Sequence, residues 1–152
     1  LSALKWSKII ICTDADVDGF QIRTLILTML YRLTPTLIDE GYVYIAETPL
    51  YEIETKSKTY YAYDDREKGE ILDMIGDEKY DIQRSKGLGE NQPEMMNLTT
   101  MNPKTRRLVK VMPEMVEATA QMFDTLLGDD LDSRKQFIAD KGNEYIEFTD
   151  LS

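Results

Sequence analysis

The stretch that decides the fold is residues 8–19, which read KIIICTDADVDG. Residues 8–12 form a short apolar and β-branched run, which is typical of a strand buried on both faces. Residues 13–19 are polar and acidic and end in a glycine, so we expect a loop there. The stretch therefore predicts a buried strand that runs directly into an acidic loop.

The segment that follows the acidic loop has a helical pattern. Apolar residues between Phe20 and Leu33 cover nearly the whole helical circumference, which predicts a buried helix. The helix should stop near Thr34, because the proline that follows disfavours helical geometry in the residue before it. A strand, a loop and a helix in this order, followed by more strands and helices, indicate an α/β fold.

The rest of the chain supplies those further elements. We expect strands at residues 42–47, 50–54, 59–63 and 81–84, and helices at 65–75 and 133–141. Residues 56–58 form a plausible hairpin turn between two of these strands. The remainder beyond Arg84 has a helical pattern, including a helix that starts at Pro113 and ends just before Gly128.

The composition excludes several classes of protein. The 152 residues fit one domain, or one with a small appendage, and contain no apolar run of membrane-spanning length. Without His, imidazole catalysis and most zinc sites are excluded. The single Cys12 is expected to be a buried structural thiol, which suits a reducing cytoplasm. With a net charge of −10, DNA contact requires a local basic surface, a bound cation or a partner subunit.

The acidic loop is the candidate functional site. Asp14, Asp16 and Asp18 alternate along the chain, so an extended backbone would point all three carboxylates to one side. Like charges gathered beside a buried strand repel one another, and a divalent cation would offset that repulsion. The loop also leaves the carboxyl end of a strand, the usual ligand-binding edge of an α/β sheet. The alternative is a solvated acidic turn, or an Asp that caps the following helix.

Two other cation-dependent sites begin with a similar pattern. An EF-hand loop that started at Asp14 would have Gly19 correctly at position 6. However, this chain has Leu25 where an EF-hand needs its bidentate Glu, and Gln21 at a position that is usually apolar. An EF-hand loop also follows a helix, whereas this loop follows a predicted strand. A phosphoaspartyl transferase of the haloacid dehalogenase type requires Thr or Val where this chain has Asp18. Neither alternative matches the sequence.

Residues 8–19 closely resemble the Toprim motif of bacterial type IIA DNA topoisomerase B subunits, those of gyrase and topoisomerase IV. The similarity continues in order through IRTL at 22–25, GYVYIA at 41–46, PLY at 49–51, KGLGE at 86–90, TTMNP at 99–103 and TRRL at 105–108. Residues 126–138 also look like the closing tail of that family. An isolated acidic triplet would be weak evidence, whereas an ordered set over nearly the whole chain is highly specific.

The resemblance implies a Toprim-like α/β fold, with a mainly parallel sheet flanked by helices and a helical carboxyl-terminal tail. It places a Toprim domain with its family-specific extension at residues 1–112 and the tail at 113–152. It also implies a Mg²⁺ cofactor, with Asp14 as the principal ligand, Asp16 at a second or alternative position and Asp18 in support. Mg²⁺ fits because it binds through one or two carboxylates and leaves positions for phosphate and water.

The chain departs from the family pattern in two places. The family's catalytic Glu lies in a motif well before the acidic loop, but only thirteen residues precede Asp14 and none is acidic. We therefore expect the segment to begin inside the Toprim domain and to hold an incomplete metal site without a catalytic residue. The family commonly has a small residue and His after the glycine, where this chain has Phe20 and Gln21. Gln21 could still donate a hydrogen bond to a DNA phosphate.

Basic residues supply the other candidate DNA contacts. Lys86 belongs to a glycine-rich turn that could approach a phosphate closely, although an ordinary strand-to-helix turn would look the same. Arg106 and Arg107 are candidates for backbone contact, with a solvated helix face as the alternative. None of the nine Tyr residues is our nucleophile, because the resemblance places the attacking Tyr on the partner A subunit.

The sequence therefore predicts a cytoplasmic, ATP-dependent type II topoisomerase fragment that belongs to the B subunit. It would contribute Mg²⁺-binding acids to cleavage and religation of double-stranded DNA, within a heterotetramer formed with the A subunit. ATP would be used by a domain outside these residues, so the fragment alone should neither hydrolyse ATP nor relax DNA. The sequence leaves open whether the parent is gyrase or topoisomerase IV. The alternative function is a non-catalytic interaction module that binds divalent cations.

Overall fold

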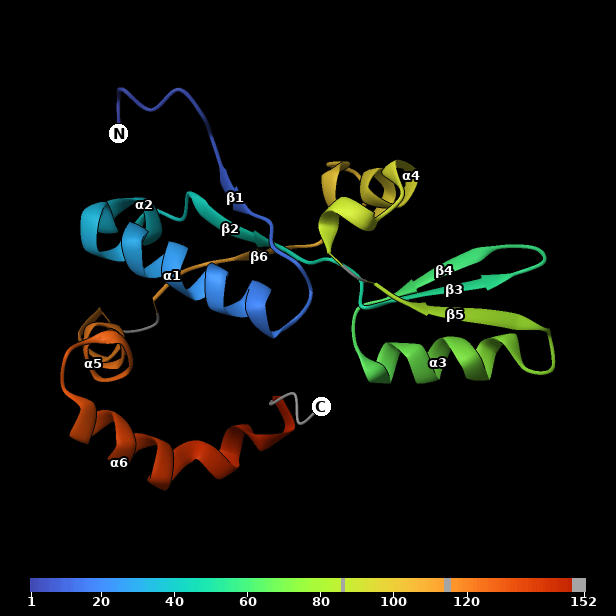
Figure 1. Cartoon of the computed structure of the whole chain (residues 1–152). Helices are drawn as coiled ribbons and strands as arrows, with labels where there is room; N and C mark the ends of the chain where they lie inside the picture. The colour runs from blue at the N-terminus through green and yellow to red at the C-terminus, as the bar shows by residue number, and fades with distance from the viewer. Residues whose placement is uncertain (86, 114–115, 149–152) are drawn as a thin grey trace.

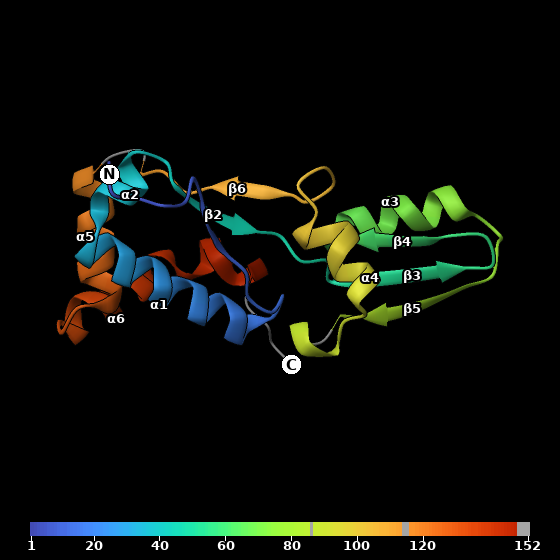
Figure 2. The same ribbon diagram turned by 90° about the horizontal axis from the view of Figure 1, so that it is seen from above.

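A computed structural model describes residues 1–85, 87–113 and 116–148. The molecule is elongated, with two small sheets that lie one beyond the other (Figures 1 and 2). Most of the helices gather around the first sheet, and a single long helix accompanies the second. No described helix is long and apolar enough to cross a membrane.

The first sheet is the scaffold of the acidic loop. It contains β1 (Ile9–Ile11), β2 (Val43–Ala46) and β6 (Leu108–Lys110), in the order β1-β2-β6. β1 is parallel to β2, whereas β6 is antiparallel to it. The connection from β1 to β2 passes through α1 (Val17–Leu33) and α2 (Pro35–Asp39). Buried Ile11, Ile38 and Val43 form the core beneath these helices, and α1 packs against it with Ile26, Leu27, Leu30 and Tyr31.

The second sheet contains β3 (Tyr51–Thr55), β4 (Thr59–Ala62) and β5 (Tyr80–Arg84), in the order β4-β3-β5. Both of its pairings are antiparallel, and α3 (Asp65–Ile75) lies along the sheet (Figure 1). The side chains of Ile53 and Ala62 are fully buried. Residues 56–58 close the hairpin between β3 and β4, as predicted.

The remaining elements connect and cover the two sheets. After β5 come η1 (Leu88–Glu90), α4 (Pro93–Met96) and η2 (Asn97–Met101), and after β6 come α5 (Val116–Leu127), α6 (Leu131–Lys141) and η3 (Gly142–Phe148). α5 packs on α1, where the rings of Tyr31 and Phe123 stack with their centroids 4.8 Å apart. Thr48 in the connection between the sheets donates a hydrogen bond of 3.3 Å to the carbonyl of Thr13, which ties the connection to the acidic loop.

The α/β class is confirmed, but the sheet is not mainly parallel. Among the described strands only β1 and β2 pair in parallel. β3 and β4 form a hairpin, β5 pairs antiparallel with the other edge of β3, and β6 is antiparallel to β2. The helical pattern beyond Arg84 was wrong for Leu108–Lys110, which forms β6. Residues 114–115, at the start of the helix predicted from Pro113, lie outside the described residues.

The helix after the acidic loop also differs from the prediction. It begins at Val17 rather than Phe20, because Asp16 caps it. It is not buried all round: Ile22, Leu25, Met29 and Leu33 are about half exposed or more. Cys12 is half-buried rather than fully buried. Only the face of α1 that meets the first sheet and α5 is covered in the described structure.

Candidate metal and nucleic-acid site

The acidic loop begins where β1 ends, and Asp14 is its anchor to the rest of the chain. The side chain of Asp14 is half-buried, and its Oδ1 accepts a hydrogen bond of 2.7 Å from the backbone N–H of Leu88. Gly87 lies against the same carboxylate, since a Cβ placed there would be 3.5 Å from Asp14 Oδ2. Tertiary structure therefore brings the predicted metal ligand to the glycine-rich turn.

Asp16 has a structural task in this arrangement. It is the N-cap of α1, and its Oδ1 accepts a hydrogen bond of 2.8 Å from the N–H of Gly19. Gly19 is buried, and a Cβ there would be 2.0 Å from the carbonyl oxygen of Asp14. Asp16 therefore does what one alternative interpretation of the loop predicted, and Gly19 lets the helix start close to Asp14.

The three acids do not form a preassembled ligand cluster. Asp18 is exposed in the first turn of α1, where a carboxylate is favoured by the helix dipole. Within the described part of the chain, no group of three Cys, Asp or Glu side chains is placed to hold a metal ion. The donor chemistry suits Mg²⁺, which needs only one or two carboxylates besides water and phosphate. The carboxylates of Asp14 and its loop neighbours thus fit Mg²⁺ in their chemistry, and the metal site stays a prediction.

A small pocket lies beside the acidic loop and was missed by sequence reasoning. It has a volume of about 190 Å³ and is lined by Ala15, Phe20, Arg23, Glu47, Thr48, Leu50 and Tyr63. Arg23 Nη2 donates a hydrogen bond of 3.3 Å to Thr13 Oγ1, and its guanidinium carbon lies 5.1 Å from the centroid of the Phe20 ring. Arg23 Nε is buried and finds no acceptor among the described residues. Burial lowers the pKa of Arg23, and the charge of Glu47 partly offsets this.

The predicted DNA-contact residues are placed differently from one another. Gln21 is exposed on α1, one turn after Val17. Lys86 lies outside the described residues. The side chain of Arg106 is half-buried, and its backbone N–H donates to the carbonyl of Asn102 at 2.9 Å. The contact of Asp14 with Gly87 and Leu88 is therefore the link that the structure shows between the acids and the glycine-rich turn.

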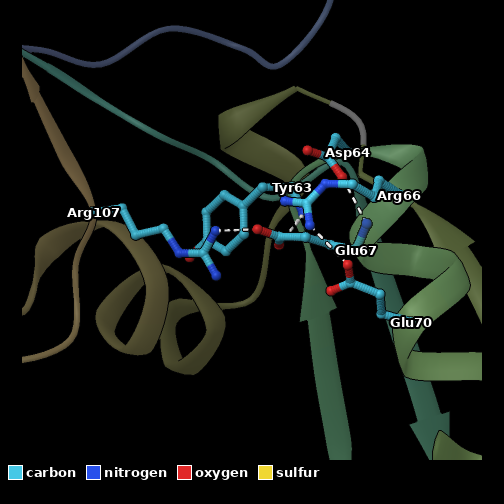
Figure 3. Close-up of polar contacts among 6 residues, drawn as sticks. All are labelled: Tyr63, Asp64, Arg66, Glu67, Glu70 and Arg107. Atoms are coloured by element: carbon cyan, nitrogen blue, oxygen red, sulfur yellow. Dashed lines mark hydrogen bonds and ion pairs between the residues drawn. The ribbon is translucent and has the colours of Figure 1, made fainter.

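Arg107 connects the two sheets (Figure 3). It directly precedes β6, and its Nη1 donates a hydrogen bond of 2.5 Å to Glu67 Oε1 on α3. Its guanidinium carbon also lies 3.9 Å from the centroid of the Tyr63 ring. The bond to Glu67 raises the pKa of Arg107, and burial raises the pKa of Tyr63. Arg107 thus has an intramolecular role besides any contact with DNA.

Glu67 is held in place by its own helix start. Asp64 is the N-cap of α3 and its Oδ1 accepts from the N–H of Glu67 at 2.7 Å. Glu67 Oε2 in turn accepts from the N–H of Tyr63 at 3.1 Å. A second ion pair, between Arg66 and Glu70 at 2.7 Å, lies farther along the helix (Figure 3). The carboxylate that receives Arg107 is therefore also oriented by a hydrogen bond from the backbone of Tyr63.

Comparison with known proteins identifies two regions of the chain. Residues 1–48 match the Toprim domain family, and residues 77–139 match the family described as DNA gyrase B subunit, carboxyl terminus. The first region contains β1, the acidic loop, α1 and β2, and the second contains the glycine-rich turn and β6. The two segments that meet at Asp14 and Leu88 therefore belong to the two matched regions.

Relatives match nearly the whole chain. The DNA gyrase B subunit of Clostridium acetobutylicum is 49% identical over 148 residues, 96% of this chain and 23% of the relative. The Thermotoga maritima protein of the same name is 46% identical, over 90% of this chain and 22% of its own length. That of Synechocystis is 42% identical, over 99% of this chain and 14% of its own. The chain spans less than a quarter of each of these relatives, and it belongs to the DNA gyrase B subunit family as a segment of the Toprim and carboxyl-terminal regions.

Proposed function

We propose that this chain supplies the Mg²⁺-binding acids of a type IIA DNA topoisomerase that cleaves and religates double-stranded DNA. The observation that carries the proposal is the contact of Asp14 with the glycine-rich turn of residues 87–89. That contact places a half-buried carboxylate beside backbone N–H groups that can approach a phosphate closely. A cation ligand and a phosphate-binding turn at one place are what phosphodiester chemistry requires.

Each residue then has a defined task. Asp14 is the principal metal ligand, held in orientation by the Leu88 N–H, while Asp16 and Asp18 support the cluster from the start of α1. Bound Mg²⁺ would supply charge neutralisation at the scissile phosphate and orientation of the leaving 3′ oxygen. DNA backbone contacts come from Lys86, Gln21, Arg106 and Arg107. The catalytic Glu and the attacking Tyr of the A subunit lie outside these residues.

The partners follow from the same proposal. They are double-stranded DNA and the A subunit, in a heterotetramer that works in the cytoplasm and uses ATP held by another region of the parent protein. The chain by itself should neither hydrolyse ATP nor relax DNA. We keep the division into residues 1–112 as the Toprim portion with its extension and 113–152 as the helical tail.

One observation favours a second function. Asp16 caps α1 and the described residues hold no three-ligand cluster, which favours a non-catalytic interaction module in which the acids bind Ca²⁺ or only cap a helix. The two functions predict different consequences of removing Asp14. Only the metal proposal makes this carboxylate the dominant source of Mg²⁺ affinity.

Titration calorimetry with Mg²⁺ and with Ca²⁺ tests the proposal on the wild type, Asp14→Ala and the exposed control Asp73→Ala on α3. We expect Asp14→Ala to weaken Mg²⁺ binding by about 100-fold, since even partners behind a metal ligand contribute 10–100-fold. Asp73→Ala should bind as the wild type does. The absence of any metal-dependent heat in all three proteins would favour the interaction module. Robust DNA relaxation by the purified chain would contradict the proposal that the catalytic Glu, the attacking Tyr and the ATP-using region lie outside these residues.

A further inference from the structure

We propose that the pocket around Arg23 binds a phosphate group of the DNA backbone next to the acidic loop. This rests on the proposed function and adds a contact residue that sequence reasoning did not find. Ala15, between Asp14 and Asp16, forms part of the pocket wall, so the pocket opens beside the proposed metal ligands. A phosphate held there would be a neighbour of the phosphate at the metal.

The incompletely paired guanidinium of Arg23, which lines the pocket, is the first indication of a ligand. This atom is buried and finds no acceptor among the described residues, while Nη2 of the same group already donates to Thr13 Oγ1 at 3.3 Å. A buried donor without an acceptor is costly, and nearly all such groups in folded proteins are satisfied. Arg23 also lines the pocket, so a phosphate there would meet the part of the side chain that faces it.

The size and chemistry of the pocket select a phosphate group. Its volume of about 190 Å³ is below the roughly 300–1,000 Å³ of sites for drug-sized ligands. A guanidinium presents its N–H groups as a planar fork that matches two phosphate oxygens. The Phe20 ring lies against the guanidinium and supports it by a cation–π contact. Tyr63 adds a phenol whose pKa is raised by burial, so the group keeps its proton.

The charges around the pocket determine when the phosphate binds. Glu47 lines the pocket and Asp14 and Asp16 lie next to it, so an anion is repelled by these carboxylates when no cation is present. Arg23 offsets one of these negative charges. Mg²⁺ on the acidic loop would offset the others, so we expect phosphate binding at Arg23 to require the metal.

The test measures binding of a short fluorescent DNA duplex by anisotropy at fixed Mg²⁺ over a series of salt concentrations. Removing one phosphate contact should reduce the slope of log affinity against log salt by about 0.9. Arg23→Gln should show this reduction and bind about tenfold more weakly, whereas Arg23→Lys should keep the slope. Arg32→Gln is the matched control, because Arg32 lies on the same helix about 13 Å away, is exposed and pairs with Asp124.

A structural role for Arg23 gives a different result. Thr13→Val removes the hydroxyl that accepts from Arg23 but leaves the cation in place. We expect it to keep the salt slope of the wild type. If Thr13→Val weakens DNA binding as much as Arg23→Gln, and neither changes the slope, Arg23 only positions the acidic loop and the inference is overturned.

The outcomes also separate this inference from the proposed function. An unchanged slope in Arg23→Gln, together with lost Mg²⁺ binding in Asp14→Ala, would overturn the inference alone. No Mg²⁺-dependent DNA binding by the wild type would overturn both. Inorganic phosphate, followed through the NMR signal of Arg23 Nε–H, identifies the source of the anion: a shift as large as that with DNA would indicate a site for the free ion.

Discussion

The Oδ1 of Asp14 and the backbone N–H of Leu88 are 2.7 Å apart, although the two residues are separated by 74 positions in the chain. This hydrogen bond joins the acidic loop after β1 to the turn after β5, and so connects the two matched family regions. A charged acceptor makes the bond stronger than a neutral one. The position of the proposed metal ligand therefore depends on a distant backbone group.

Asp14→Ala should loosen the turn of residues 87–90. Loss of one charge-assisted bond is worth about 1.5 kcal/mol, so exchange of the Leu88 amide should become about tenfold faster. Asp14→Asn keeps an acceptor oxygen and should show a smaller effect. Hydrogen exchange followed by NMR provides the measurement, with Asp18→Ala as the control. Equal exchange in the wild type and Asp14→Ala would mean that the bond contributes nothing.

Gly19→Ala and Gly69→Ala should change stability in opposite directions. A Cβ at Gly19 would lie 2.0 Å from the carbonyl oxygen of Asp14, so the loop must move, at a cost of about 1–3 kcal/mol or more. Gly69 is inside α3 and a Cβ there meets no atom within 4 Å. Alanine should stabilise the protein at that site by about 0.8–1 kcal/mol. Urea unfolding of the two variants checks both signs.

Asp16 allows the capping and metal-binding roles to be separated. Asp16→Ala should lower the free energy of unfolding by about 1 kcal/mol, because the Gly19 N–H loses its acceptor. Asp16→Asn should keep the cap but lose the charge. If Asp16 is also a ligand, Asp16→Asn binds Mg²⁺ more weakly at nearly unchanged stability. Urea unfolding and calorimetry on both variants distinguish the roles, and unaltered Mg²⁺ affinity in Asp16→Asn would restrict this residue to capping.

The contact of Arg107 with Glu67 should couple the two sheets only modestly. Both side chains retain solvent contact, 46% and 19% exposed, so a double-mutant cycle with Arg107→Ala and Glu67→Ala should give about 0.2–1 kcal/mol. Stacking on Tyr63 adds about 0.5–1 kcal/mol, lost in Tyr63→Leu. A coupling energy of zero in urea unfolding would show that the ion pair does not hold the sheets together.

The start of α6 should respond to acid. Hydrogen bonds from Ser133 lower the pKa of the N-cap Asp130 below the ordinary value of 3.8. Because the folded-state pKa is depressed, the stabilisation is complete above 3.8 and is lost as the pH falls through the folded-state pKa. The Ser133 amide signal in NMR should follow this loss. Asp130→Asn keeps an oxygen that can cap the helix but has no carboxyl group to titrate, so its Ser133 signal should stay constant below pH 3.8. A signal that moves as in the wild type would contradict this assignment.

Local patterns were sufficient for much of the secondary structure. The helix at Asp65–Ile75 was predicted with its observed bounds, and the strands of the second sheet within one residue or two. The structure explains why for this helix: the capping bond of Asp64 reaches only three residues along the chain. Such interactions are encoded in neighbouring residues.

The tertiary structure decided the rest. β6 was missed because Leu108–Lys110 is too short to show the alternation of apolar and polar residues that predicts a strand. It becomes a strand only by pairing with β2. The pairing of Arg107 with Glu67, and the pocket lined by Arg23, Glu47 and Tyr63, likewise depend on segments distant in sequence.

The sequence by itself determined the acidic loop and its family, and it predicted the cation chemistry of the loop. Only the folded chain decided that Asp14 meets Leu88 and that Asp18 is exposed. The physical reason is the distance along the chain between the groups that interact. Charge and residue type can be read position by position, whereas a site is made when the packing of both sheets holds distant groups at hydrogen-bonding distance.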